Sequence, residues 1–261
     1  MLYNVNDLHI GRSLDLYGEW AESELELLGL FLAPGDVVVD VGANIGTHAV
    51  FFAGKVGPTG KVLAFEPQRI VFQMLCANVA LNGLGNVHAH QAAAGAADGT
   101  LHVPPVSYEA PGNYGGVGLR AAGGEPVPVV ALDGLGLDRC KVLKVDVEGM
   151  ELAVLDGARS LIERTQPIIY VENNDAAKSP ALIARLLDLR YHLFWHFSRF
   201  YNPGNFLGNP DNVFANVGDI NMICVRPDLA PAFKDFPAVE GPEDTFEALQ
   251  RRRRATAVAS S

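Results

Sequence analysis

The sequence predicts an α/β protein with a doubly wound, mostly parallel sheet and an antiparallel strand near the C-terminal end of that sheet. Apolar, β-branched runs alternate with segments of helical spacing along most of the 261 residues. Strands that alternate with helices in this way require a parallel sheet with right-handed crossovers. Two later apolar runs, 191–195 and 221–225, are separated by a loop rich in Asn, Gly and aromatic residues, and we expect them to pair antiparallel.

Each expected element follows from a local pattern. Val37–Val41 is a nearly continuous β-branched run, which is typical of a strand buried on both faces. A helix over 20–32 is predicted by leucines at helical spacing, and Pro34-Gly35 ends it. The further expected strands are 62–65, 87–91, 142–145 and 168–171, and the further expected helices are 47–55, 68–81, 150–163 and 181–189.

The chain is predicted to form one domain over residues 1–240, with a helical N-terminal segment to about residue 35. The alternation breaks over about 98–135, around the glycine-rich stretch 112–124. An insertion of this length in an α/β sheet is either a β-hairpin or a mobile loop, and either could help to cover a site. For residues 241–261 we expect a flexible tail that carries the basic run 251–254.

Composition excludes several classes of protein. Hydrophobic residues make up 49% and charged residues 19%, as in ordered globular proteins. The formal net charge of −10 argues against a nucleic-acid partner, which needs a basic face. The three cysteines are widely spaced, which predicts reduced packing residues rather than disulfides or a zinc site. With no leader pattern and no transmembrane segment, we expect a cytoplasmic protein, whose oligomeric state the sequence leaves open.

The turn after the first strand reads Asp-Val-Gly-Ala-Asn-Ile-Gly over residues 40–46. Ligands of open α/β sheets bind outside the carboxyl ends of the strands, where the strand order reverses. Both glycines of this turn allow a close approach of the backbone to a ligand. The N-terminus of the following helix adds partial positive charge that suits a carboxylate or a phosphate.

The choice of cofactor depends on neighbouring residues. A dinucleotide fingerprint that starts at Gly42 requires two more glycines, but Asn44 and Thr47 occupy those positions. Asp40 would repel a pyrophosphate and attract the ammonium of an amino-acid tail. Glu66 ends the next strand, where a carboxylate can accept hydrogen bonds from both ribose hydroxyls. These residues favour S-adenosylmethionine over a dinucleotide.

Three stretches together resemble the FkbM family of S-adenosylmethionine-dependent methyltransferases. They are 39–46, Phe-Glu-Pro at 65–67, and Leu-Lys-Val-Asp-Val-Glu-Gly-Met-Glu at 143–151. The resemblance implies a Rossmann-like class I methyltransferase fold and O-methylation of a hydroxyl on a sugar, glycan or natural product, with a small-molecule or carbohydrate acceptor. It also implies which residues contact the cofactor, namely Asp40, Gly42, Asn44, Gly46 and Glu66.

Two mechanisms for activating the acceptor hydroxyl remain open. In the first, a base takes the proton, and the candidates are Asp146, Glu148 and His196. In the second, a divalent cation such as Mg²⁺ binds the acceptor oxygen, and the candidate ligands at strand ends are Asp146, Glu172 and Asn173. His48, just after the glycine turn, is expected to cap or pack its helix.

Two other functions are alternatives. The chain could be a non-catalytic S-adenosylmethionine-binding or scaffold protein that kept the fold, or an NAD-dependent oxidoreductase. Polar groups at several strand ends argue against an inert scaffold, and the missing glycines argue against NAD.

Overall fold

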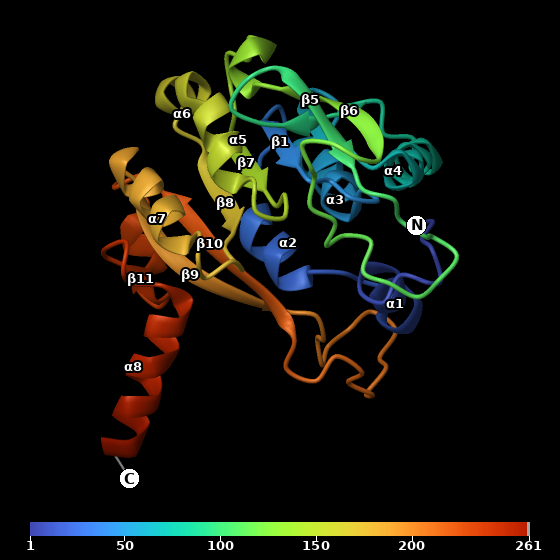
Figure 1. The fold of residues 1–261 in the computed structure, drawn as a ribbon. Coiled ribbons are helices and arrows are strands. Elements are labelled where there is room, and N and C mark those ends of the chain that lie inside the picture. Colours follow the sequence, from blue (N-terminus) through green and yellow to red (C-terminus); the bar gives the residue numbers. More distant parts are fainter. Residues whose placement is uncertain (260–261) are drawn as a thin grey trace.

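The computed structural model describes residues 1–259 and is built on a mixed eight-stranded sheet with helices on both faces (Figure 1). The strand order is β11-β9-β10-β8-β7-β1-β2-β3. These strands are β1 (Val37–Val41), β2 (Lys61–Phe65), β3 (Val87–His90), β7 (Val142–Val145), β8 (Ile168–Glu172), β9 (His192–Arg199), β10 (Gly218–Val225) and β11 (Ala238–Val239).

The sheet confirms the predicted fold class. Strands β3, β2, β1, β7 and β8 pair in parallel, whereas β10 runs antiparallel between β8 and β9. The chain continues from β1 to β2 on one side, and β7 flanks β1 on the other. The order therefore reverses beside β1, and the turn that follows β1 lies at this switch point. The short edge strand β11 was not predicted.

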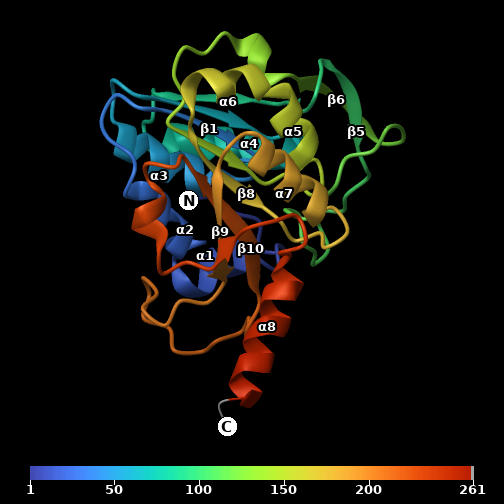
Figure 2. The ribbon, with the colours of Figure 1, turned by 90° about the vertical axis from the view of Figure 1, so that its left-hand side faces the viewer.

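Alternate residues of the strands face two separate apolar cores. Val38 packs with α2 (Glu22–Gly29), α3 (Thr47–Val56) and α4 (Arg69–Leu81) on one face of the sheet. Val39 packs with α5 (Glu151–Gly157), α6 (Arg159–Thr165) and α7 (Ser179–Asp188) on the other face. Because neighbouring residues point to opposite faces, a strand covered on both sides is mostly apolar. Figure 2 shows the two layers of helices with the sheet between them.

Two helical predictions needed correction. The single helix expected over 150–163 is two helices, α5 and α6, which meet at the fully buried Ala158. Asp133 explains the break, because its carboxylate accepts hydrogen bonds from the backbone N–H groups of Ser160 and Leu161 and so caps a new helix start. The short helix α1 (Ile10–Tyr17), within the N-terminal segment, was not located by spacing.

The insertion contains a β-hairpin, one of the two forms expected. Strands β5 (Gly99–Val103) and β6 (Glu125–Val130) pair antiparallel, and β6 also pairs with β4 (Ala93–Ala94) to give a second, three-stranded sheet. A 3₁₀ turn follows at Leu132–Leu135. The long connection between β5 and β6 runs toward the N-terminal segment and α1 (Figure 1).

The structure places a helix within the C-terminal segment for which a flexible tail is expected. Beyond a 3₁₀ turn at Ala230–Phe233, helix α8 (Phe246–Ala259) projects from the body of the protein (Figures 1 and 2). Phe246 packs against Trp195 and Phe197, which fixes the start of the helix. The side chains of Arg253 and Arg254 lie outside the described part, so the structure does not assess the basic run as a whole. No helix of the described residues is long and apolar enough to span a bilayer.

Candidate functional site

The turn after β1 has a left-handed backbone at three positions, with φ values of 79° at Gly42, 49° at Asn44 and 92° at Gly46. At Gly42 a Cβ atom would collide with the carbonyl oxygen of Asp146, so only glycine fits there. Gly46 begins α3 and approaches Leu75 closely. The turn therefore lies against the end of β7, as a binding turn at the switch point requires.

Glu66 joins the ends of β1 and β2. Its side chain is almost fully buried, and its two carboxylate oxygens accept hydrogen bonds from the backbone N–H groups of Asn44, at 3.1 Å, and Gln68, at 2.8 Å. Burial is the largest influence on this carboxyl group and raises its pKa to about 7, although both hydrogen bonds oppose the shift. Glu66 is thus poised to change charge near neutral pH.

Two adjoining pockets open at this edge of the sheet and share Gly42, Glu66, Asp146 and Glu148 in their walls. We call the first the apolar pocket because most of its remaining lining is apolar: Val41, Phe65, Pro67, Ala92, Ala93, Ala94, Val117, Leu119, Val147 and Met150. We call the second the polar pocket because its remaining lining includes many titratable side chains: His9, Glu24, His48, Lys144, Glu172 and Asp219.

Lys144 is the central cation of the polar pocket. Its ammonium group lies 3.2 Å from Asp146 Oδ2 and 3.5 Å from Asp40 Oδ1, and its side chain is almost fully buried. Burial alone would lower its pKa, but the charges of Asp146, Asp40 and Glu24 outweigh burial and raise the pKa above the usual value. Lys144 therefore stays protonated and cannot serve as a base.

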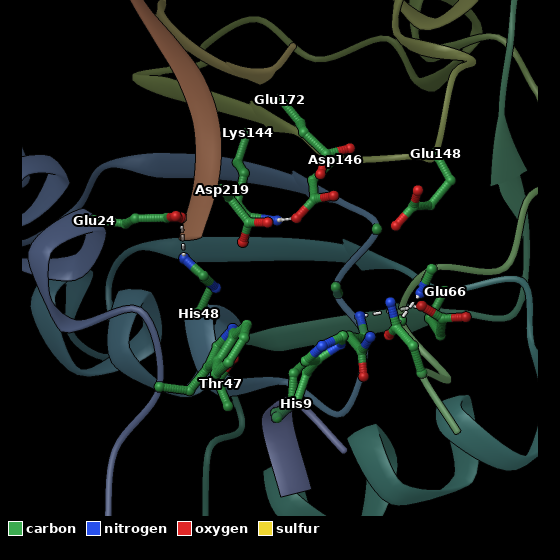
Figure 3. A pocket seen from close by; sticks show the side chains of 18 of the residues that line it. His9, Glu24, Thr47, His48, Glu66, Lys144, Asp146, Glu148, Glu172 and Asp219 are labelled. Carbon is green, nitrogen blue, oxygen red and sulfur yellow. Dashed lines mark hydrogen bonds and ion pairs between the residues drawn. The ribbon is translucent and has the colours of Figure 1, made fainter. Parts of the chain in front are cut away.

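A second buried pair closes the opposite side of the polar pocket (Figure 3). Glu24 Oε2 lies 3.1 Å from His48 Nε2, and Glu24 Oε1 accepts a hydrogen bond from the amide of Asn221 at 3.0 Å. Burial raises the pKa of Glu24, but His48 and Lys144 more than offset it, so the net pKa is lowered. His48 thus lines the pocket and has a charged partner, beyond the capping or packing expected of it.

Acidic side chains crowd the wall formed by β7, β8 and β10. Carboxylate oxygens of Asp146, Glu148 and Glu172 all lie within 4.8 Å of one another. Burial followed by the charge of Asp146 raises the pKa of Asp219 to about 8 and that of Glu172 to about 11. The side chain of Glu148 is exposed, but partial loss of solvation and the charge of Asp146 raise its pKa to about 7. Without a bound cation, this wall holds protons at neutral pH. Of its carboxyl groups with raised pKa values, Glu148 has the one closest to pH 7.

The structure separates the predicted site residues into two groups. Gly42, Asn44, Glu66, Asp146 and Glu148 line the pockets. Glu172, a predicted metal ligand, also lines the polar pocket. The remaining four lie outside both pockets: Asp40 is fully buried behind Lys144, Gly46 shapes the start of α3, His196 Nδ1 lies 2.7 Å from the Tyr170 hydroxyl, and the Asn173 amide faces Met222 Sδ.

Sequence reasoning missed Glu24, Lys144, Asp219 and His9. For two of these residues the sequence contains a signal that could have indicated them. Lys144 is a charged residue in a strand expected to be covered on both faces, and Glu24 lies four residues before Leu28 on the buried side of its helix. A charge in such a position requires a buried partner or a ligand. Asp219 and His9 follow no periodic pattern and lie beside the site only through the tertiary fold.

Comparison with known proteins now identifies the class. Residues 40–193, more than half of the chain, match the family model described as the methyltransferase FkbM domain. The chain therefore belongs to the FkbM methyltransferase domain family, as the resemblance predicted. The matched region extends from Asp40 into β9 and includes most of the residues around both pockets.

Two curated relatives are methyltransferases by name. The chain is 35% identical over 157 residues to methyltransferase sdnD of Sordaria araneosa, covering 46% of this chain and 59% of that protein. It is 30% identical over 165 residues to the hexuronic acid methyltransferase AglP of Haloferax volcanii, covering 61% and 64%. The chain thus matches about three-fifths of the length of these relatives.

Solved structures support the fold. The methyltransferase FkbM of Methylobacillus flagellatus KT superposes with a TM-score of 0.50 at 19% identity, covering 73% of this chain and 43% of that one. A precorrin 8w decarboxylase of Methanobacterium thermoautotrophicum gives the same TM-score at 14% identity, covering 86% and 99%. At such identities the similarity concerns the fold, which is that of class I S-adenosylmethionine-dependent methyltransferases.

Proposed function

We propose that this protein transfers the methyl group of S-adenosylmethionine to a hydroxyl of a small-molecule or carbohydrate acceptor. The observation that carries the proposal is the pair of pockets at the switch point, one apolar and one polar, with Glu66 between them. An adenosyl group has an apolar base and a ribose with two hydroxyls, so it matches an apolar slot beside a buried carboxylate. Family membership supports the same cofactor.

Different residues around the pockets are assigned to different parts of the cofactor. The apolar pocket is assigned to adenine, Glu66 to the ribose hydroxyls, and the turn at Gly42 and Asn44 with the start of α3 to the amino-acid tail. When bound, S-adenosylmethionine supplies an electrophilic methyl group on a sulfonium. The polar pocket next to this position is left for the acceptor.

Glu148 is the best-placed proton acceptor. A general base works best with a pKa near the operating pH, and the pKa of Glu148 is about 7. Its backbone has a φ of 52°, an uncommon conformation for a residue with a side chain and one that occurs often at active sites. Asp146 is held by Lys144 and is assigned to orienting the acceptor. Neither His196 nor Lys144 is included as a base.

The acceptor class is inferred from the pocket and from the relatives. Among the described residues, Lys144 is the only lysine or arginine that lines the polar pocket, and acidic side chains already neutralise it. An uncharged hydroxyl compound fits this wall better than an anion does. Sugars, glycans and hydroxylated natural products satisfy this requirement, although one relative is named for a hexuronic acid.

A divalent cation is the alternative way to activate the hydroxyl. The three grouped carboxylates of Asp146, Glu148 and Glu172 are the kind of hard oxygen ligands that Mg²⁺ takes. Asn173, the other predicted ligand, follows Glu172 at the end of β8, and its side-chain nitrogen lies 3.5 Å from Met222 Sδ. Activity that survives exhaustive EDTA treatment would exclude this mechanism, whereas loss that Mg²⁺ restores would replace Glu148 as the activating group.

Two measurements test the proposed function. Calorimetric titration with S-adenosylhomocysteine and, separately, with NAD should give binding of the first ligand and none of the second. Incubation with methyl-labelled S-adenosylmethionine and a panel of hydroxylated acceptors should then give a labelled product. Binding without transfer to any acceptor would support the scaffold alternative, and tight binding of NAD alone would overturn the proposal in favour of an oxidoreductase.

A further inference from the structure

One segment of the insertion forms a wall of both pockets. We call residues 108–119 the strap. Gly115, Val117 and Leu119 of the strap line the apolar pocket, and Asn113, Gly115 and Gly116 line the polar pocket. The position assigned to adenine and the position assigned to the acceptor therefore share a boundary that does not belong to the central sheet.

The strap passes close over the cofactor turn. A Cβ atom on Gly115 would lie 3.0 Å from the side-chain nitrogen of Asn44, and one on Gly118 would lie 3.5 Å from the carbonyl oxygen of Glu148. At Gly115 a larger residue would require the Asn44 side chain to shift, whereas the distance at Gly118 is an ordinary van der Waals contact. The strap therefore lies next to the turn, and residues of both line the two pockets.

Gln68 fastens the strap to the cofactor site. Its side chain is almost fully buried, donates from Nε2 to the carbonyl oxygen of Tyr114 at 2.7 Å, and accepts at Oε1 from the hydroxyl of Tyr108 at 3.0 Å. Its backbone N–H binds the Glu66 carboxylate. One residue therefore holds both the carboxylate assigned to the ribose and the segment that covers it.

The N-terminal segment holds the strap at a second point. Leu8 and Gly112 are joined by a hydrogen bond of 3.0 Å from the Leu8 N–H to the Gly112 carbonyl oxygen, and the Gly112 N–H donates to Asn6 at 3.0 Å. His9, the next residue, lines the polar pocket. A movement of the strap would therefore also change the wall of the acceptor position.

We propose that Gln68 is a positioning residue that latches the strap over the bound cofactor, and that the cofactor leaves only after both side-chain hydrogen bonds of Gln68 break. The inference rests on the proposed function, because it concerns the same cofactor site. It implies that the acceptor pocket is complete only when the strap is closed, because strap residues form part of the wall of that pocket.

The test follows release of S-adenosylhomocysteine from the full chain by stopped-flow fluorescence of Trp20, which lines the polar pocket. Gln68→Ala should raise the dissociation rate constant roughly tenfold, as expected for the loss of two ordinary hydrogen bonds. The association rate constant should change by no more than about twofold, since differences between related complexes arise mostly in dissociation. Gln73→Ala, an exposed position on the same helix, is the matched control.

Tyr108→Phe provides a second variant that keeps the ring and removes one donor, so it remains informative if Gln68→Ala fails to fold. It should raise the dissociation rate constant by roughly threefold. Hydrogen exchange should show that the ligand protects residues 108–119 in the wild type and protects them less in both variants, while exchange in the central sheet stays at the wild-type rate.

The possible outcomes separate the two proposals. If the wild type does not bind S-adenosylhomocysteine, the proposed function fails. If the wild type binds it, but Gln68→Ala or Tyr108→Phe releases it at the wild-type rate, the latch is overturned. Faster exchange throughout the chain with a lower melting temperature would assign Gln68 a purely structural role and would also overturn the latch.

Discussion

The charge state of Glu66 makes cofactor binding dependent on pH. Ribose hydroxyls donate hydrogen bonds, so the ionised carboxylate accepts both of them, whereas a protonated carboxyl group does not. Glu66 has a pKa of about 7 in the free protein, so it is mostly protonated below pH 7. At such pH values it must release this proton before the cofactor binds. One pKa unit corresponds to about 1.4 kcal/mol, so S-adenosylhomocysteine should bind about tenfold more weakly at pH 6 than at pH 8.

Isothermal titration at pH 6, 7 and 8, in two buffers of different ionisation enthalpy, measures both the affinity and the number of protons released. Glu66→Gln should weaken binding at pH 8 by roughly tenfold or more, because it removes charge-assisted hydrogen bonds, and it should abolish the pH dependence. Glu148→Gln is the control, since Glu148 has a similar pKa and lines both pockets but does not contact the turn. A flat wild-type profile, or a slope that persists in Glu66→Gln, would refute the assignment of Glu66.

Three further outcomes follow from the site. Glu148→Gln should lower kcat by roughly 10²–10⁴, the usual contribution of a general base, while the affinity for S-adenosylhomocysteine at pH 8 stays near that of the wild type; an equal loss of affinity would place Glu148 among the cofactor contacts. Between pH 4.5 and about 11, Glu172 is protonated in the folded state but ionised in the unfolded chain. Its contribution to stability therefore falls as pH rises. Glu172→Gln should raise the free energy of unfolding at pH 8 by about 1–3 kcal/mol in urea melts. Gly42→Ala should fold poorly or lose ligand binding, because the added Cβ would collide with Asp146 and the backbone φ at this position is 79°. Wild-type affinity in this variant would contradict the close approach of the ends of β1 and β7.

The fold was largely predictable because its central strands are covered on both faces. Strands β1 and β7 begin and end where the apolar runs do, since burial on both sides leaves little choice of residue. Prediction failed where tertiary contacts decided the structure. The break at Ala158 depends on Asp133, which lies 25 positions earlier in the chain, and the start of α8 depends on Trp195 and Phe197. The local spacing of residues carries no information about partners that are distant in the sequence.

The cofactor half of the site was more predictable than the acceptor half, for a related reason. Gly42, Asn44 and Glu66 come from one turn and one strand end, whose relation is set by the parallel pairing of β1 with β2. The acceptor half collects Glu24 from α2, Lys144 from β7 and Asp219 from β10. These elements are up to 195 residues apart in sequence, from Glu24 to Asp219, and no single motif includes them.

Lys144 changes the interpretation of Asp40. The sequence indicated that Asp40 attracts the ammonium of the cofactor, but the structure pairs its fully buried carboxylate with Lys144 instead. Lys144 in β7 pairs with both Asp40 in the adjacent strand β1 and Asp146. It thereby holds the turn and Asp146 in a fixed relation, because its removal would leave the buried carboxylate of Asp40 uncompensated. We therefore propose that another acid of the polar pocket, rather than Asp40, meets the ammonium of the cofactor.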